Sequence, residues 1–373
     1  MEIINHRFWL YDFKVYYSAA ENFMAGNSVY HQAYGLSSGF YKYSPFALLL
    51  FSPLALLPFE IAKVIYYLIV SGAIISIFFL LRNGLKKYFP QFISISEKQW
   101  PWLVIAIICM VHFLRELHLG NVNALILLAL LISIYFIVSE KPIRGGILLG
   151  FILLVKPHFV LLLILLALRK KFKVLVSSIL IFIIGLFLPA ILVGLSSNFD
   201  LLVSWKNTMI EHNVSLTNHP DTLFSWIYRF FDPNAGKAVM IIILGLIGVF
   251  GLLLIFWNKK KEQSSNEKGI SNFIFESCLI IALIPNLTLT DSEHFLFALP
   301  LISLLFCSLI VSKNVVFKVV AILSFVMYGG NWHDAVGSKI SDWLSVTGIL
   351  GMGNFLIILL FVFYYIYLQN RKK

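Results

Sequence analysis

Residues 141–173 read KPIRGGILLGFILLVKPHFVLLLILLALRKKFK. Basic clusters bracket the apolar run 145–168, and a single lysine interrupts that run at Lys156, directly before Pro157. The hydrocarbon core of a bilayer is about 30 Å thick, so a helical crossing needs about 20 apolar residues. Lys and Arg concentrate in cytoplasmic loops. This stretch therefore predicts a membrane segment that enters and leaves on the cytoplasmic face.

The middle of this segment predicts a turn. Each apolar arm has about eleven residues, which at about 1.5 Å per residue is too short to cross the membrane. Proline lacks a backbone donor and biases the preceding residue away from helix, so Lys156-Pro157 is the expected apex of a re-entrant hairpin. A lysine buried at such an apex is costly and usually functional. The alternative is one tilted helix over 145–168 whose Lys156 snorkels, with a neighbouring crossing misassigned.

The composition of the whole chain fits this interpretation. Of 373 residues, 60% are hydrophobic and 13% charged, and the mean hydropathy is +0.88, which excludes a soluble enzyme. The net charge of +11 lies in short clusters between apolar runs, so nucleic acid is not an expected partner. The three cysteines lie in apolar runs without C-x-x-C spacing, which indicates neither a zinc site nor a disulfide framework.

Outward from the hairpin, the hydropathy predicts an all-α integral membrane protein with about nine crossings. They fall at roughly 61–81, 101–115, 122–138, 174–195, 237–257, 272–286, 294–311, 315–329 and 346–368. When the crossings alternate, every basic cluster and the C-terminus fall on the cytoplasmic side. We expect a single domain overall, with residues 1–44 as an extracytoplasmic loop and residues 45–373 as the transmembrane part. No cleavable signal peptide is visible.

The opposite face is rich in polar and aromatic residues. It holds residues 1–44 and the loops at about 115–121, 196–236, 287–293 and 330–345, while no histidine falls in a predicted cytoplasmic loop. This asymmetry favours an active site at the outer membrane surface. An ordinary interfacial belt is the alternative, and it explains the aromatic residues but not the histidines and carboxylates.

The first outer loop contains a predicted amphipathic helix. Apolar residues recur at helical spacing over 11–26, with Asp12 at the expected N-cap and Gly26 at the expected C-terminal stop. We expect this helix to lie on the membrane surface.

Several short motifs in this order resemble glycosyltransferase family 87, which consists of membrane enzymes of the GT-C class. The motifs are Asp12-Phe13, Tyr16-Tyr17, Gly26, Tyr30, Tyr43-Ser44-Pro45, the Pro53 to Pro58 segment, Gly120-Asn121-Val122-Asn123, Lys156-Pro157, Asn213-x-Ser215, and Pro285 followed by His294. Asn121 stands where the family usually has Gln. The family pattern also places a membrane helix before the Asp-bearing loop, whereas Met1 lies within that loop.

The resemblance implies a GT-C-like helical bundle that transfers a sugar, with inversion, on the outer face of the membrane. The donor would be a polyprenyl-phosphate sugar, the acceptor a lipid-linked or cell-envelope glycan, and the sugar a hexose, with mannose as the family's best-known cargo. Asp12 matches the family's catalytic carboxylate and would be the general base, although it could instead cap its helix. Membrane lipid is the remaining expected partner, and we expect no cofactor and no obligatory metal.

The leaving phosphate needs cationic or hydrogen-bonding groups. Lys156 is the first candidate, because an ammonium in a partly dehydrated site attracts a phosphate strongly. His294 and Arg115 are the next candidates; the alternatives are an interfacial histidine beside acidic residues and a surface ion pair with Glu116. We assign Tyr16, Tyr43, Asn121 and Asn123 to sugar and acceptor binding, although the two asparagines could merely cap a helix.

Two other functions compete with this prediction. A lipid or glycan transporter or flippase would often show paired broken helices in two repeated halves, whereas we find one broken segment. A noncatalytic subunit of an envelope-assembly complex would tolerate Asp12→Ala. The expected location is the plasma membrane of a bacterium.

Overall fold

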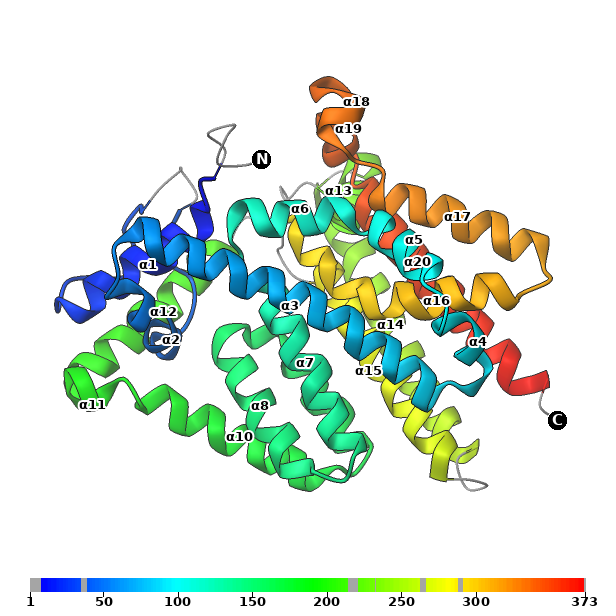
Figure 1. The fold of residues 1–373 in the computed structure, drawn as a ribbon, viewed down its shortest axis with the longest axis horizontal. Coiled ribbons are helices and arrows are strands. Elements are labelled where there is room, and N and C mark those ends of the chain that lie inside the picture. The colour runs from blue at the N-terminus through cyan, green and yellow to red at the C-terminus, as the bar shows by residue number, and fades with distance from the viewer. Residues whose placement is uncertain are drawn as a thin grey trace. The chain divides into compact units, whose positions relative to one another are not determined.

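The structure is a computed structural model, and it describes residues 8–34, 39–213, 221–231, 233–261, 266–287 and 291–371. Its regular elements in these ranges are helices, and an isolated bridge joins Ala33 to Phe40 (Figure 1). The predicted all-α fold is confirmed. The chain divides into two compact units, one of residues 1–77 and 114–214 and the other of residues 78–113 and 215–373.

The first unit contains α1, the helix that carries Asp12, and a group of apolar helices. Its elements are α1 (Tyr11–Met24), α2 (Pro45–Ala55), the first part of α3 (Phe59–Tyr88), the end of α6 (Met110–Leu119), α7 (Asn123–Val138), α8 (Pro142–Val155), the 3-10 helix η2 (Pro157–Val160), α9 (Leu161–Leu168), α10 (Phe172–Phe187), α11 (Ala190–Val193) and α12 (Leu195–Asn213).

Small residues let α8 pack closely between α7 and α10. A Cβ atom on Gly150 would lie 2.7 Å from the carbonyl oxygen of Ser178 on α10, and one on Gly145 would lie 2.9 Å from that of Ser133 on α7. The Ser133 hydroxyl also donates a 2.8 Å hydrogen bond to the carbonyl of Gly145. Small residues at helix interfaces are typical of membrane bundles, where close approach provides the packing energy.

The predicted helix break in the 145–168 run is confirmed. Helix α8 ends at Val155, the backbone of Lys156 is non-helical, and η2 begins at Pro157. The proline ring and its missing N–H explain why the helix stops here. The course of the two arms through the membrane stays a prediction.

The predicted amphipathic helix is present as α1 and its place on the membrane surface stays a prediction, but one detail of the helix prediction is wrong. The N-cap is Leu10, with φ 48°, and its side chain makes no capping hydrogen bond. Asp12 therefore lies inside the first turn and is not the N-cap residue. Gly26, with φ 72°, follows the helix end as expected.

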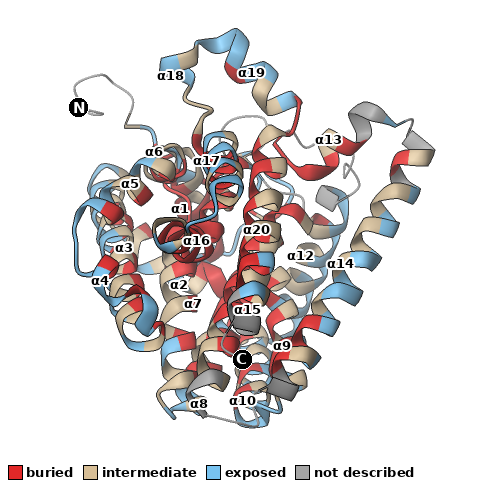
Figure 2. Ribbon diagram, turned by 90° about the vertical axis from the view of Figure 1, so that its right-hand side faces the viewer, coloured by how far each residue is buried: buried red, intermediate tan, exposed pale blue. Residues whose placement is uncertain are grey.

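The second unit is built around a buried helix. Its elements are the end of α3, η1 (Pro90–Phe92), α4 (Ile93–Ser96), α5 (Trp100–Ile108), the start of α6, α13 (Leu223–Phe230), α14 (Pro233–Lys261), α15 (Asn266–Leu287), η4 (Ser292–Ala298), α16 (Leu299–Val311), α17 (Val315–Gly329), α18 (His333–Val336), α19 (Ser338–Val346) and α20 (Ile349–Arg371). Residues Leu299 to Ser308 of α16 are all buried, and Figure 2 shows this helix mostly in red.

The chain is a multi-pass membrane protein, although nine crossings are not confirmed. Six helices among the described residues are long and apolar enough to span a membrane, and seven if α5 and α6, bent by 62°, count as one broken span. The crossings predicted at 122–138 and 315–329 are helices α7 and α17, with 16 and 15 residues. Each is shorter than the roughly 20 residues that a perpendicular crossing needs.

Candidate active site

A tight turn between α6 and α7 organises the site in the first unit. The N–H groups of Gly120 and Asn121 donate to the carbonyl oxygen of Glu116 at 2.9 and 3.2 Å, which closes the end of α6. Gly120 has φ 67°, a conformation that glycine adopts without penalty. A Cβ atom here would lie 2.9 Å from Leu10 Cδ2 and 3.0 Å from Phe13 Cβ, so the start of α1 packs directly on the turn.

This contact joins Asp12 to Asn121. The Asn121 amide nitrogen donates a 2.7 Å hydrogen bond to Asp12 Oδ2. The other end of the same amide accepts a 2.7 Å bond from the N–H of Val122, so its orientation is fixed. The Tyr66 hydroxyl donates to the backbone carbonyl oxygen of Asn121 at 3.3 Å. Asn121 is buried and Asp12 is half-buried, so the Asp12 carboxylate is held in place at the edge of the buried turn.

A second carboxylate, Glu116, is fully buried beside this turn. It accepts a 2.6 Å hydrogen bond from the N–H of Ala124 and a 3.1 Å bond from the amide of Asn123. The carboxylate thus satisfies donors at the N-terminus of α7, where negative charge is favoured by the helix dipole. Glu116 is not among the predicted site residues. Its place one turn before the Gly120 to Asn123 motif is the signal that could have identified it.

Lys156 contacts the site through the aromatic ring of Tyr43. Its ammonium lies 5.8 Å from the centre of the Tyr43 ring, a cation–π distance, and its side chain is only 3% exposed. The Tyr43 hydroxyl is 3.1 Å from that of Tyr16, and the Tyr30 hydroxyl donates to the Tyr43 carbonyl at 2.8 Å. Burial raises the pKa of Tyr16 well above its usual value, and nearby Tyr43 and Asp12 raise it further. Tyr16 is therefore a neutral hydroxyl that can donate or accept.

The structure thus brings together six of the eight predicted site residues. These six residues lie on α1, in the loop before α2, at the α6–α7 turn with the first residue of α7, and at the break after α8. They are Asp12, Tyr16, Tyr43, Asn121, Asn123 and Lys156. Asn123 is fully buried and binds Glu116. The roles given to these residues stay predictions.

Two predicted phosphate ligands, Arg115 and His294, are not among these six residues. Arg115 is exposed on α6 while its neighbour Glu116 is buried, because successive helical residues point about 100° apart. His294 belongs to the second unit and lies in η4. Its backbone N–H donates to the backbone carbonyl of Asp291 at 3.1 Å. The family landmark Asn213-x-Ser215 extends outside the described residues.

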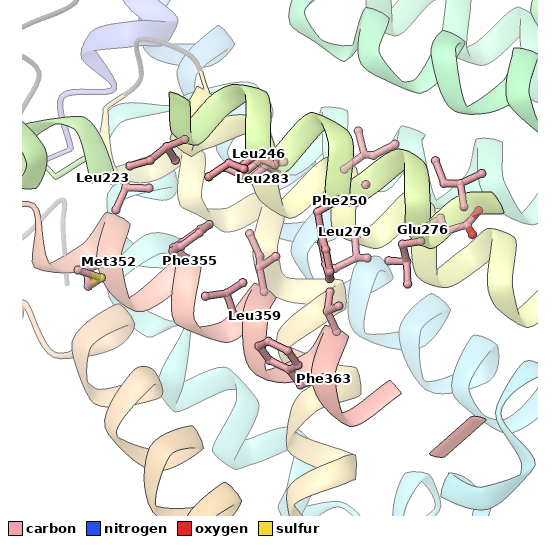
Figure 3. Close-up of a pocket in the computed structure, with 18 of the residues that line it drawn as sticks. Leu223, Leu246, Phe250, Glu276, Leu279, Leu283, Met352, Phe355, Leu359 and Phe363 are labelled. Atoms are coloured by element: carbon pink, nitrogen blue, oxygen red, sulfur yellow. The ribbon is translucent and has the colours of Figure 1, made fainter. Parts of the chain in front are cut away.

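The second unit contains a cavity with a largely apolar lining. It has a volume of about 560 Å³ and lies among α13, α14, α15 and α20 (Figure 3). Among the described residues that line it, Glu276 is the charged one, and its carboxylate accepts a 2.8 Å hydrogen bond from Asn258. The remaining lining is apolar or aromatic, which suits a hydrocarbon chain.

No group of three His, Cys, Asp or Glu side chains within the described ranges is placed to hold a metal ion. The expectation that no metal is needed stays a prediction.

The site around Asp12 contains the carboxylate of a half-buried residue, a buried ammonium and neutral hydroxyls. A carboxylate can accept a proton, and an ammonium can stabilise an anionic leaving group.

Fold and site together define a multi-pass helical membrane protein with a polar site built on its loops and helix ends. Comparison with known families identifies its class. The chain belongs to glycosyltransferase family 87, whose sequence profile matches residues 40–282. The predicted family is therefore confirmed, and with it the prediction of a glycosyltransferase at the level of the family.

Curated relatives carry a more specific name. An alpha-(1->3)-arabinofuranosyltransferase of Corynebacterium glutamicum is 30% identical over 190 residues, which are 48% of this chain and 44% of the relative. The proteins of the same name from Mycobacterium tuberculosis and Mycolicibacterium smegmatis are 27% and 26% identical, over 46% and 45% of this chain and 39% and 38% of their own length. The chain thus spans less than half the length of these relatives. No solved structure matches it significantly.

Proposed function

We propose that this chain transfers a sugar from a polyprenyl-phosphate donor to a hydroxyl of a lipid-linked or cell-envelope glycan acceptor. The observation that carries the proposal is the hydrogen bond between Asn121 and Asp12, which holds the carboxylate of a half-buried residue in one orientation. Family membership gives the reaction class. The bond matters because a general base must keep a fixed geometry toward the proton it removes.

In the proposed reaction, Asp12 takes the proton of the acceptor hydroxyl as its oxygen attacks the anomeric carbon of the donor. The bond from that carbon to the phosphate oxygen breaks, and the polyprenyl phosphate leaves with the electron pair. The ammonium of Lys156 stabilises the negative charge that grows on the phosphate. A single displacement inverts the anomeric carbon, so no covalent sugar–enzyme intermediate forms.

The proposed setting is the outer face of a bacterial plasma membrane. The C-terminus is proposed to be cytoplasmic because the basic clusters, including Arg169 to Lys173 and Arg371 to Lys373, fall on one side when the predicted crossings alternate. The Asp12 loop then faces outward, where envelope glycans are assembled.

Two sugars are the leading donor candidates. The family resemblance implies a hexose, with mannose the best-known, while the relatives in the comparison are named for arabinofuranose. Both donors carry the same polyprenyl-phosphate leaving group, so Asp12 and Lys156 would have the same roles with either sugar.

The test is sugar transfer by purified full chain in proteoliposomes, with labelled polyprenyl-phosphate mannose and polyprenyl-phosphate arabinofuranose as separate donors and envelope glycolipids as acceptors. We expect transfer with one of them and a loss of about 10²–10⁴-fold in Asp12→Asn, the range that a general base contributes. Asp200→Asn, an exposed carboxylate on α12, is the matched control.

Equal rates for Asp12→Asn and wild type would exclude Asp12 as the base. No transfer by wild type from any donor, combined with movement of the intact glycolipid across the bilayer, would favour the transporter instead.

A further inference from the structure

Helix α12 begins where a membrane-spanning segment ends. The apolar segment Phe172–Val193 is long enough to span a bilayer, Gly194 turns the chain with φ 81°, and α12 starts at Leu195. The amide of Asn198, one turn into α12, donates a 3.1 Å hydrogen bond to the carbonyl of Leu186 in α10. The start of α12 is therefore attached to the last turns of the apolar helix α10.

One arc of α12 is apolar and exposed. Four exposed apolar residues of α12 lie within an arc of about 80° around the helix, because successive residues of an α-helix are about 100° apart. They are Leu195, Phe199, Val203 and Ile210, with exposed fractions of 64%, 53%, 55% and 54%. Lys206 lies on the same arc and is exposed. A lysine in such a place can bury its alkyl chain and extend its ammonium to lipid phosphates.

The adjoining arc is polar and also exposed. Ser196, Asp200, Asn207 and Glu211 fall within about 60° of one another by the same spacing. Apart from Lys206, the exposed residues of these two arcs are therefore divided lengthwise into apolar and polar sets. A soluble surface helix would instead bury its apolar side against the protein and expose polar residues.

The third arc of α12 packs against the protein through polar contacts. The indole N–H of Trp205 donates a 3.0 Å hydrogen bond to the carbonyl of Lys42, next to Tyr43. The Thr208 hydroxyl lies 3.4 Å from the His31 ring, and the other nitrogen of that ring lies 3.2 Å from the Glu211 carboxylate. These contacts attach α12 to the loop that carries Tyr43. In Figure 1, α12 folds back from α10 and α11 toward α2.

We infer that α12 is an interfacial helix whose apolar arc lies among the lipid acyl chains and whose polar arc faces water. The partner is the bilayer itself, because the helix starts at the end of a span and its exposed surface is divided lengthwise into an apolar and a polar half. Its third arc holds the Tyr43 loop at the depth of the lipid headgroups. This inference does not depend on the proposed sugar transfer.

The test places single cysteines on the two exposed arcs of the full chain. Phe199→Cys and Val203→Cys report the apolar arc, and Asp200→Cys and Asn207→Cys report the polar arc. Each variant is labelled with an environment-sensitive fluorophore in proteoliposomes and quenched with aqueous iodide or with lipid spin-labelled near the headgroup. Wild type gives the labelling background, because its cysteines Cys109, Cys278 and Cys307 are buried.

We expect the labels at 199 and 203 to be quenched at least threefold more by the spin-labelled lipid than by iodide, and those at 200 and 207 to show the reverse. Equal quenching by iodide at all four positions would overturn the inference, since the apolar arc would then face water. Protection of 199 and 203 from both quenchers would overturn it too, because a protein would then cover the arc. Sugar transfer is not read in this assay, so its result is independent of the proposed function.

Discussion

The Asn121 amide nitrogen donates a 2.7 Å hydrogen bond to the Asp12 carboxylate, across 109 positions of sequence. The bond joins the first turn of α1 to the turn between α6 and α7. Because the oxygen of the same amide accepts from the N–H of Val122, the amide plane is fixed and one of its two N–H groups is directed at Asp12. Asn121 is thus a positioning residue for Asp12 in the proposed reaction.

Replacing Asn121 by alanine should slow sugar transfer by about 10- to 100-fold, because a hydrogen bond to a charged group contributes about 1.5–3 kcal/mol. The measurement is the initial rate in proteoliposomes at matched protein amounts. Asn207→Ala, on the exposed polar arc of α12, is the control. A rate equal to wild type in Asn121→Ala would show that the bond does not orient the base.

Lys156→Met should reduce kcat by about 10²–10³-fold, the usual cost of removing one group that stabilises developing negative charge. The methionine keeps a long apolar chain beside Tyr43 and removes the ammonium. Lys141→Met, an exposed lysine before α8, should leave kcat unchanged. The proposed role of Lys156 is rejected if kcat is kept and only protein yield falls.

Glu116→Ala should lower the free energy of unfolding by about 2–4 kcal/mol, because it leaves the buried donors of Asn123 and Ala124 without their acceptor. Glu116→Gln keeps one acceptor oxygen and should cost about half as much. Thermal unfolding in detergent measures both. Equal stability of the alanine variant and wild type would mean that other groups satisfy these donors.

Gly120→Ala should destabilise the chain by at least about 1–2 kcal/mol, the cost of a left-handed residue with a side chain. The added methyl would also press on Leu10 and Phe13 and separate α1 from the turn, so sugar transfer should fall as well. Gly72→Ala is the matched control, since a Cβ atom there meets nothing within 4 Å. Gly72→Ala should be neutral or slightly stabilising in its helix. Similar melting temperatures for the two variants would contradict this prediction.

Stability should fall as pH rises above about 10, the usual pKa of tyrosine. Burial raises the pKa values of Tyr16, Tyr30 and Tyr41 in the folded chain, so these phenols ionise first in the unfolded chain. The unfolded state then binds fewer protons than the folded state, and linkage favours unfolding. Melting temperatures from pH 8 to pH 11 measure the effect. Tyr41→Phe should flatten this decline, and an unchanged slope would argue against a raised pKa for Tyr41.

Some parts of this fold were predictable because they depend on local chemistry. Apolar length predicted the long spans, and Lys156-Pro157 predicted the break between α8 and η2, because proline acts on its own backbone. Crossing lengths were less predictable. Helices α7 and α17 are shorter than a full crossing, since neighbouring turns decide where an apolar run stops being helical.

The site was predictable as a set of residue types and motifs but not as a geometry. The order of the motifs pointed to Asp12, Asn121 and Lys156, yet no local pattern indicates that Asp12 and Asn121 form a pair. Asp12 was wrongly predicted as an N-cap, because its actual position in α1 depends on the left-handed Leu10 that packs against Gly120. Glu116 was missed because its burial depends on tertiary packing, although its place one turn before the Gly120 to Asn123 motif was a local signal.

By itself, the sequence determined a helical membrane protein of this family, since hydropathy, basic clusters and short motifs act over a few residues. Only the tertiary structure decided that Asn121 holds Asp12, that Glu116 satisfies the start of α7, and that the outer surface of α12 is divided between apolar and polar residues. The first of these relationships joins segments far apart in sequence, and the other two depend on which side of a helix packing buries.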